Sequence, residues 1–136
     1  YRVGSSTLLA ADPAVAEVTA TADLTALRPF APVQPRARRT AGGIAISWIR
    51  RTRLGGDGWD LAEIGLGEAS ERYRLVIRDA AGAARRTVET TEPAFLYASA
   101  AELADFGSAL TAIRLSIAQL SAVAGEGRAL EAVLPL

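Results

Sequence analysis

The clearest structural pattern in this sequence lies in residues 71–91, ERYRLVIRDAAGAARRTVETT. Tyr73, Leu75 and Ile77 alternate there with arginines, as expected of a strand that buries one face and leaves the other in water. Residues 79–82 supply a turn, and the Thr- and Val-containing sequence behind it favours a returning strand. The stretch therefore predicts an antiparallel β-hairpin.

Upstream of the hairpin the chain reads GGIAISWIRRTRLGGDGWD. Ile44, Ile46 and Trp48 recur with a period of two, which predicts a second strand with Trp48 in the core. A basic cluster follows this strand directly: Arg50, Arg51 and Arg53. Residues 54–70 then carry five glycines, and their length predicts either a mobile loop or a short strand near residues 59–64.

Residues 99–136 combine two periodicities. Ser99 and Glu102 have the spacing of a capping box, which predicts a short helix that ends at Gly107. Residues 113–117 fit either a continued helix or a strand, and a glycine inside a helix costs about 1 kcal/mol, which favours the strand. A glycine turn and a closing strand over the last eight residues complete the pattern.

The first 29 residues differ from the rest of the chain. They contain a short alternation of apolar and polar residues that fits either a strand pair or a tail. Prolines at positions 29, 32 and 35 predict an interdomain connector or a broken edge strand, because proline cannot donate a ladder hydrogen bond. We therefore assign residues 1–29 to the end of a preceding domain or a linker, and residues 30–136 to one domain. The sequence begins with Tyr, and we expect it to be a piece of a longer polypeptide.

Six or seven short strands separated by turn signals predict an all-β fold, namely an antiparallel β-sandwich with one short helix. The composition agrees with a folded domain, since 50% of the 136 residues are hydrophobic and 22% are charged. Fifteen arginines balance fifteen acidic residues, so the chain has no net field that would attract nucleic acid. No apolar run reaches the roughly 20 residues that a membrane span needs, so we expect none.

The missing residue types restrict the chemistry. The chain has no Lys, His, Cys, Met or Asn, so it lacks the usual zinc ligands, a thiol nucleophile and a Ser-His-Asp triad. Asp57, Asp60 and Glu63 do not have the spacing of a calcium loop, and nothing in the sequence supplies the cleft that a glycosidase carboxylate pair needs. We expect no metal, no cofactor and no enzymatic activity.

The order of these features resembles a fibronectin type III domain. A proline-bearing strand precedes a strand that carries Trp48 and a strand that opens on Tyr73. A Gly-x-Gly hairpin at Gly125 and Gly127 and a closing strand follow. The chain departs from that pattern near Ile113, where the Tyr that usually opens the penultimate strand is missing.

Several stretches resemble the C-terminal region of the large tail-tip protein of alphaproteobacterial gene transfer agents and related siphophages, sometimes called the megatron protein. The stretches are RPFAPVQPRARR, GGIAISWIRRTRLGGDGWD, LGEASERYRLVI and RTVETTEPAFLY. The particles are phage-derived tailed capsids that carry host DNA between cells. The resemblance covers most of residues 28–136. It leaves out the family's hub domain and its barrel that resembles glycoside hydrolases, so no hydrolase residue is carried over.

This resemblance implies a structural and adhesion module at the tail tip, or baseplate, of a virion-like particle that is assembled in the cytoplasm and extracellular after release. It implies as partners other copies of the same protein, three around the tail axis, together with the hub protein, the distal tail protein and a host-surface glycan.

The candidate interface residues all lie between positions 50 and 60. Trp59 lies in the Gly-rich loop and is expected either to contact a partner or to fold back over the open end of the sandwich. The other candidates are charged: Asp57, Asp60, Arg50, Arg51 and Arg53. The arginines favour a solvated strand end over a phosphate site, and pairing with acids of the loop is a further interpretation.

The alternative function is a carbohydrate-binding sandwich that serves a surface glycoside hydrolase. Its stacking rings would be Trp59, Tyr73 or Tyr97. Exposure of at least two of these rings on one face would favour sugar binding, whereas their burial would favour the structural function.

Overall fold

The computed structural model describes residues 2, 3, 5, 7, 9, 11–19, 23–53 and 65–136 of the chain. Within these ranges the sandwich is built from β3 (Val33–Thr40), β4 (Gly43–Ile49), β5 (Tyr73–Arg78), β6 (Ala84–Thr90), β7 (Ala94–Ala98), β8 (Ala112–Ser121) and β9 (Gly125–Pro135). One helix, α1 (Ser99–Phe106), connects β7 to β8. The N-terminal residues add β1 (Arg2–Val3), β2 (Ala16–Glu17) and the 3-10 helix η1 (Leu24–Leu27).

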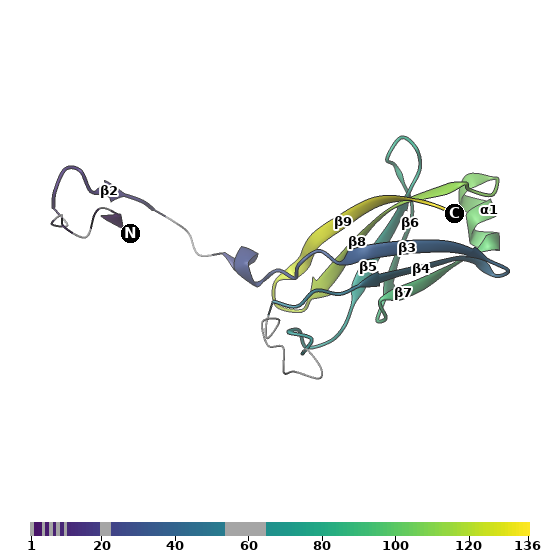
Figure 1. The fold of residues 1–136 in the computed structure, drawn as a ribbon, viewed down its shortest axis with the longest axis horizontal. Helices are drawn as coiled ribbons and strands as arrows, with labels where there is room; N and C mark the ends of the chain where they lie inside the picture. Colours follow the sequence, from purple (N-terminus) through teal and green to yellow (C-terminus); the bar gives the residue numbers. More distant parts are fainter. Residues whose placement is uncertain are drawn as a thin grey trace.

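The strands of the sandwich form two antiparallel sheets (Figure 1). One sheet has three strands in the order β3-β4-β7, and the other has four strands in the order β6-β5-β8-β9. Neighbouring strands in both sheets run antiparallel. The predicted all-β sandwich with one short helix is therefore confirmed.

The core lies between the two sheets and is filled by alternate residues of their central strands. From β4 it takes Ile44, Ile46 and Trp48, and Trp48 is only 4% exposed, as predicted. The four-stranded sheet contributes Tyr73, Leu75, Ile77, Ile113, Leu115 and Ile117. The rings of Trp48 and Tyr73 meet edge to face, with centroids 5.2 Å apart. Burial of each such side chain stabilises the fold by about 1.5–3 kcal/mol.

The predicted hairpin is formed by β5 and β6. Asp79 organises its turn, because its backbone N–H donates to the Ala83 carbonyl and its carboxylate accepts from the Ala83 N–H, both at 2.9 Å. Gly82 has a φ of 88°, a left-handed conformation that favours glycine. Asp79 and Gly82 therefore account for the turn that the sequence predicts here.

The proline segment forms a broken edge strand rather than a free connector. Pro29 and Pro32 are buried, and the Pro29 carbonyl accepts a hydrogen bond of 3.1 Å from the N–H of Arg128. Strand β3 then begins at Val33, at the edge of its sheet, with an irregular register near Pro35. Proline is tolerated there because the outer edge needs no ladder hydrogen bond.

Helix α1 begins at Ser99 and is closed by Gly107 in a left-handed conformation, as predicted. The predicted capping box is wrong, since the N-cap residue is Ala98 and no side chain caps the helix. Glu102 instead turns inward and is 2% exposed, because there its carboxylate accepts two bonds from an arginine of β3 and one from the Leu110 N–H, whereas a capping box would give it a single backbone N–H. The strand interpretation of residues 113–117 is confirmed by β8.

The N-terminal residues form a strand pair, one of the two predicted alternatives. Arg2–Val3 pairs antiparallel with Ala16–Glu17. Figure 1 shows this pair apart from the sandwich, joined to it through η1. The short strand predicted near residues 59–64 lies outside the described residues.

Candidate functional site

The arginines of the basic cluster behind β4 contact different parts of the chain. A guanidinium N–H of Arg50 donates to the Gly65 carbonyl at 3.2 Å. The guanidinium of Arg51 lies over the ring of Phe30, 5.0 Å from its centroid. The structure thus directs the two arginines to different neighbours.

Arg53 is partly enclosed, with 18% of its side chain exposed. It donates to the carboxylate of Glu68 at 3.2 Å and to the Ala26 carbonyl at 3.4 Å. The sequence prediction missed Glu68, whose side chain is 8% exposed. The pair ties the segment behind β4 to the segment before β5 and to η1. The predicted loop partners and contact residues, Asp57, Trp59, Asp60 and Glu63, lie outside the described residues.

Two carboxylates of α1, three residues apart, link the helix to both sheets. Glu102 accepts hydrogen bonds of 2.9 and 2.8 Å from the Arg39 guanidinium in β3 and one of 2.7 Å from the Leu110 N–H. Asp105 accepts bonds of 2.6 and 2.9 Å from the Arg86 guanidinium in β6. One face of α1 is therefore bonded to β3 of the three-stranded sheet and to β6 of the four-stranded sheet.

The same contacts determine the ionisation of these carboxylates. The hydrogen bonds from Arg39 hold the pKa of Glu102 below its ordinary value, and those from Arg86 do the same for the pKa of Asp105. A general acid needs a raised pKa and access to substrate. These two groups are ionised and occupied by arginines, so the arrangement is structural.

The rings proposed to stack on sugar are not available for it. Tyr73 and Tyr97 are both 0% exposed, so their assignment as stacking residues is wrong. Their hydroxyls donate to Glu71 and Asp105, each at 2.6 Å. Burial is the main cause that raises the pKa of both phenols. The strand period brings these rings into the core, because both face inward from their sheets.

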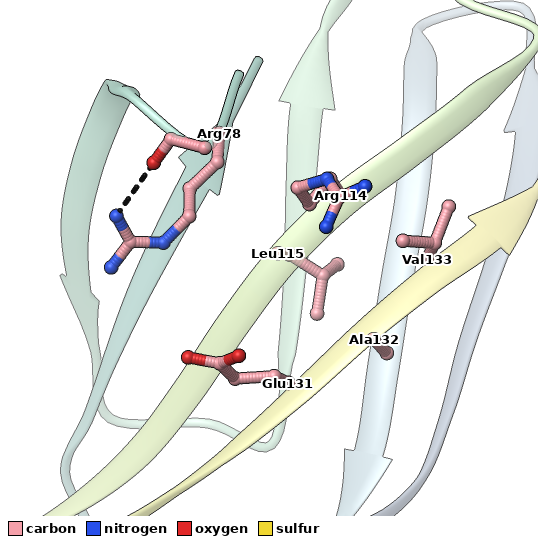
Figure 2. Close-up of a pocket in the computed structure, with 7 residues that line it drawn as sticks. Arg78, Arg114, Leu115, Glu131, Ala132 and Val133 are labelled. Atoms are coloured by element: carbon pink, nitrogen blue, oxygen red, sulfur yellow. Dashed lines mark hydrogen bonds between the residues drawn. The ribbon is translucent and has the colours of Figure 1, made fainter. Parts of the chain in front are cut away.

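A shallow pocket of about 510 Å³ lies on the outer face of the four-stranded sheet (Figure 2). Arg78 of β5 and Arg114 of β8 are register partners there, so two arginines project from neighbouring positions of adjacent strands, and Figure 2 shows the Arg78 guanidinium turned away from Arg114. Arg78 donates to the Gly82 carbonyl at 3.1 Å, and Figure 2 shows Glu131 of β9 at the opposite side of the pocket. The arginines can attract an anion, but Glu131 opposes it. The sequence signal was the outward position of Arg78 in the alternating pattern.

Among the described residues, no group of three or more His, Cys, Asp or Glu side chains is arranged to hold a metal ion. No helix in the same ranges is long and apolar enough to cross a membrane. The sequence matches no protein-family model and no curated protein.

Proposed function

We propose that this chain is a non-enzymatic, fibronectin-III-like module of the large tail-tip protein of a gene transfer agent or related siphophage. The resemblance of residues 28–136 supports this proposal. The strand order also supports it, because the fourth strand of the sandwich, β6, pairs with β5 in the four-stranded sheet. In immunoglobulin constant-type domains the fourth strand joins the sheet of the first two strands instead.

The observation that carries the function is where the chain enters and leaves the sandwich. Pro29 is held at the β8–β9 turn through its bond with Arg128, and Gly127 leaves no room there for a side chain. At the other end, beside α1, the N–H of Leu136 donates to the Thr111 carbonyl at 3.1 Å. Figure 1 shows the segment that follows η1 and the helix α1 at opposite ends of the sandwich. A module joined to neighbours at these two ends would separate them by its own length.

Ion pairs between elements give such a spacer stiffness. Arg39 with Glu102 and Arg86 with Asp105 fix α1 to both sheets, and Arg53 with Glu68 fixes the opposite end. These pairs lie at both ends of the sandwich, where neighbouring modules would transmit load. In this proposal the residues of these three ion pairs stabilise the arrangement of the helix, the strands and the end segments.

In the proposed role the sandwich sits at the tail tip beside copies of the same protein and the hub and distal tail proteins. Contact with the host envelope falls to the Gly-rich loop, with Trp59, Asp57 and Asp60 as the contact residues. A host glycan is the expected chemistry of that contact, because Trp stacks on sugar rings and is frequent at binding hot spots.

The location is tested by a short epitope inserted between Ala80 and Ala81, which are exposed in the β5–β6 turn. Purified particles from the source cells are reconstructed with and without an antibody fragment bound to the epitope. Extra density at the tail tip is the expected result. If the epitope is associated with no particle, the proposal is wrong.

The host contact is tested separately with Trp59→Ala. Particles that carry it should assemble normally but attach to host cells less than unmodified particles do. Val123→Ala, at a residue 70% exposed in the β8–β9 turn, is the matched control and should attach normally. Equal attachment by both variants would remove Trp59 from the contact while leaving the structural role in place.

A further inference from the structure

The edge strands of the sandwich differ in how they are protected against pairing with another chain. Within the described ranges the sandwich has four edge strands, and three of them carry proline, charged side chains or an irregular register. These features are the usual means by which proteins prevent the addition of a further strand. The fourth, β7, reads AFLYA and has neither charge nor proline, and its register with β4 is regular. β7 is therefore the edge that is open to pairing.

The backbone of β7 alternates between β4 and the outside of the sheet. The Trp48 N–H donates to the Pro93 carbonyl and the Ser99 N–H donates to the Gly42 carbonyl, each at 3.1 Å, so positions 93 and 99 face β4. Alternate residues of an antiparallel strand bond to the same neighbour, so positions 95 and 97 face β4 as well. The backbone groups between them point away from the sheet, namely those of Ala94, Leu96 and Ala98.

The outward side chains of β7 are apolar. Leu96 is 53% exposed, and Ala94 and Ala98 are also exposed. Their register partners in β4 add no charge, since Leu96 lies opposite Ala45 and Ala94 lies opposite Ser47. An added strand would cover Leu96 and bond to the outward backbone groups. The edge therefore fits a partner strand that is itself uncharged and apolar on one face.

We propose that β7 pairs antiparallel with β7 of a second copy of this chain, with the two Leu96 residues opposite each other. The two Leu96 residues then exchange both of their backbone hydrogen bonds and pack side by side. The Ala98 N–H of each copy donates to the Ala94 carbonyl of the other, whereas the Ala98 carbonyl is kept by α1, for which Ala98 is the N-cap residue. The contact is the same from both sides, so it closes as a two-fold dimer.

The positions of the charges also favour this arrangement. On the outer face of the three-stranded sheet, Arg36 and Arg38 belong to β3, two strands away from β7. In the dimer the two β3 strands are separated by five strand spacings, about 24 Å, which exceeds the Debye length of about 8 Å at physiological salt. Face-to-face packing of the same sheets would instead bring these arginines together.

The same register brings an acid to the helix of each copy. Positions 93 and 99 still follow the strand, so Pro93 faces Ser99 of the other copy, which is the first residue of α1. Glu92, next to Pro93, is exposed and forms no ion pair with a described residue. It therefore lies near the N-terminus of the other copy's α1, which has no side-chain cap and where a negative charge is favourable.

The inference does not rest on the tail-tip proposal, because a two-fold pair differs from a three-fold contact around the tail axis. It is tested by sedimentation velocity and amide hydrogen exchange of the 136-residue chain from micromolar to millimolar concentration. We expect a weak dimer, since a five-residue edge is a small contact. The N–H groups of Leu96 and Ala98 should be protected only as the dimer forms, whereas those of Phe95 and Tyr97, which are bonded to β4, should be protected at every concentration.

Substitutions of Leu96 test the register. Leu96→Lys and Leu96→Glu should each raise the dissociation constant at least about tenfold, because each places two like charges opposite each other. An equimolar mixture of the two variants should form a heterodimer, which high salt weakens. Val133→Lys and Val133→Glu, at a residue 55% exposed on β9, are the matched controls and should leave association unchanged.

A monomer at all concentrations would overturn the proposal, and so would a dimer that both Leu96 variants leave intact. Exchange at Leu96 that does not slow as the dimer forms would also overturn it, because another surface would then make the contact. If a substitution at Leu96 unfolds the chain, the exchange pattern of the unmodified protein decides.

Discussion

The carboxylate of Glu102 in α1 accepts two hydrogen bonds from the guanidinium of Arg39 in β3, although the two residues are 63 positions apart in the sequence. Glu102 is buried while 37% of the Arg39 side chain is exposed, so water reaches the pair from one side only. The third bond of this carboxylate, from the Leu110 N–H, fixes the segment that leads into β8. One side chain therefore joins the helix, the first strand of the sandwich and the start of the penultimate strand.

Glu102→Ala should lower the free energy of unfolding by about 2 kcal/mol, because it leaves the Leu110 N–H without its partner and removes bonds to a charged group. Urea unfolding at neutral pH measures the loss. Ser99→Ala is the matched control on the same helix and should change stability by less than about 0.5 kcal/mol. A capping box would produce a cost of about 1 kcal/mol for Ser99→Ala, so the two variants distinguish the arrangements.

Acidification should destabilise the sandwich through Glu102 and Asp105. Their folded-state pKa values lie below the ordinary values of 4.5 and 3.8, so the unfolded chain binds protons first as the pH falls. The stabilisation is therefore complete above the ordinary values and is lost as the pH falls below them toward the folded-state values. Urea unfolding as a function of pH should show this decrease.

Glu102→Gln with Asp105→Asn should be less stable at neutral pH and should lose less further stability on acidification. Glu131→Gln, at an exposed carboxyl that makes no ion pair with a described residue, is the control and should keep the slope of the unmodified protein. An unchanged slope in the double variant would show that other carboxyls cause the acid sensitivity.

Gly43→Ala should be far more costly than Gly82→Ala, although both glycines have positive φ angles, of 142° and 88°. A Cβ at position 43 would lie 2.1 Å from the Tyr97 carbonyl oxygen, whereas nothing lies within 4 Å of one at position 82. We expect about 1 kcal/mol for Gly82→Ala and about 3 kcal/mol or more for Gly43→Ala. Thermal unfolding of both variants checks the order, and equal losses would contradict the close contact of β4 with β7.

Trp48 should be shielded from solvent in the folded protein. In a Trp59→Phe background it is the sole tryptophan, and its fluorescence should resist quenching by acrylamide until the protein unfolds. Rapid quenching under native conditions would place Trp48 outside the core. The same variant without denaturant also reports whether the fold tolerates the change in the Gly-rich loop.

The alternating stretches around Tyr73 and Trp48 were sufficient to predict strands β5 and β4 and their part of the core. A period of two assigns side chains to the two faces of a strand, and that assignment depends only on local geometry. The hairpin of β5 and β6 could also be predicted, because Asp79 and Gly82 are residue types that favour a turn.

The sequence prediction failed where a side chain had both a possible partner nearby in the sequence and one far away. Glu102 had the spacing for a local cap, but it pairs with Arg39, which no local rule could identify. Glu68, the partner of Arg53, was missed for the same reason. Tyr97 was proposed as an exposed ring. In the structure it points inward from β7, where it is the register partner of Ile44.

The sequence by itself determined the class of fold, the inward faces of the main strands, the short helix and the turns, since these depend on neighbours within a few positions. The tertiary structure alone decided which arginine meets which carboxylate, which face of the three-stranded sheet stays open, and that the chain enters and leaves at opposite ends. Those features depend on how the two sheets pair, and strand pairing brings together residues whose separation in the sequence carries no information about their contact.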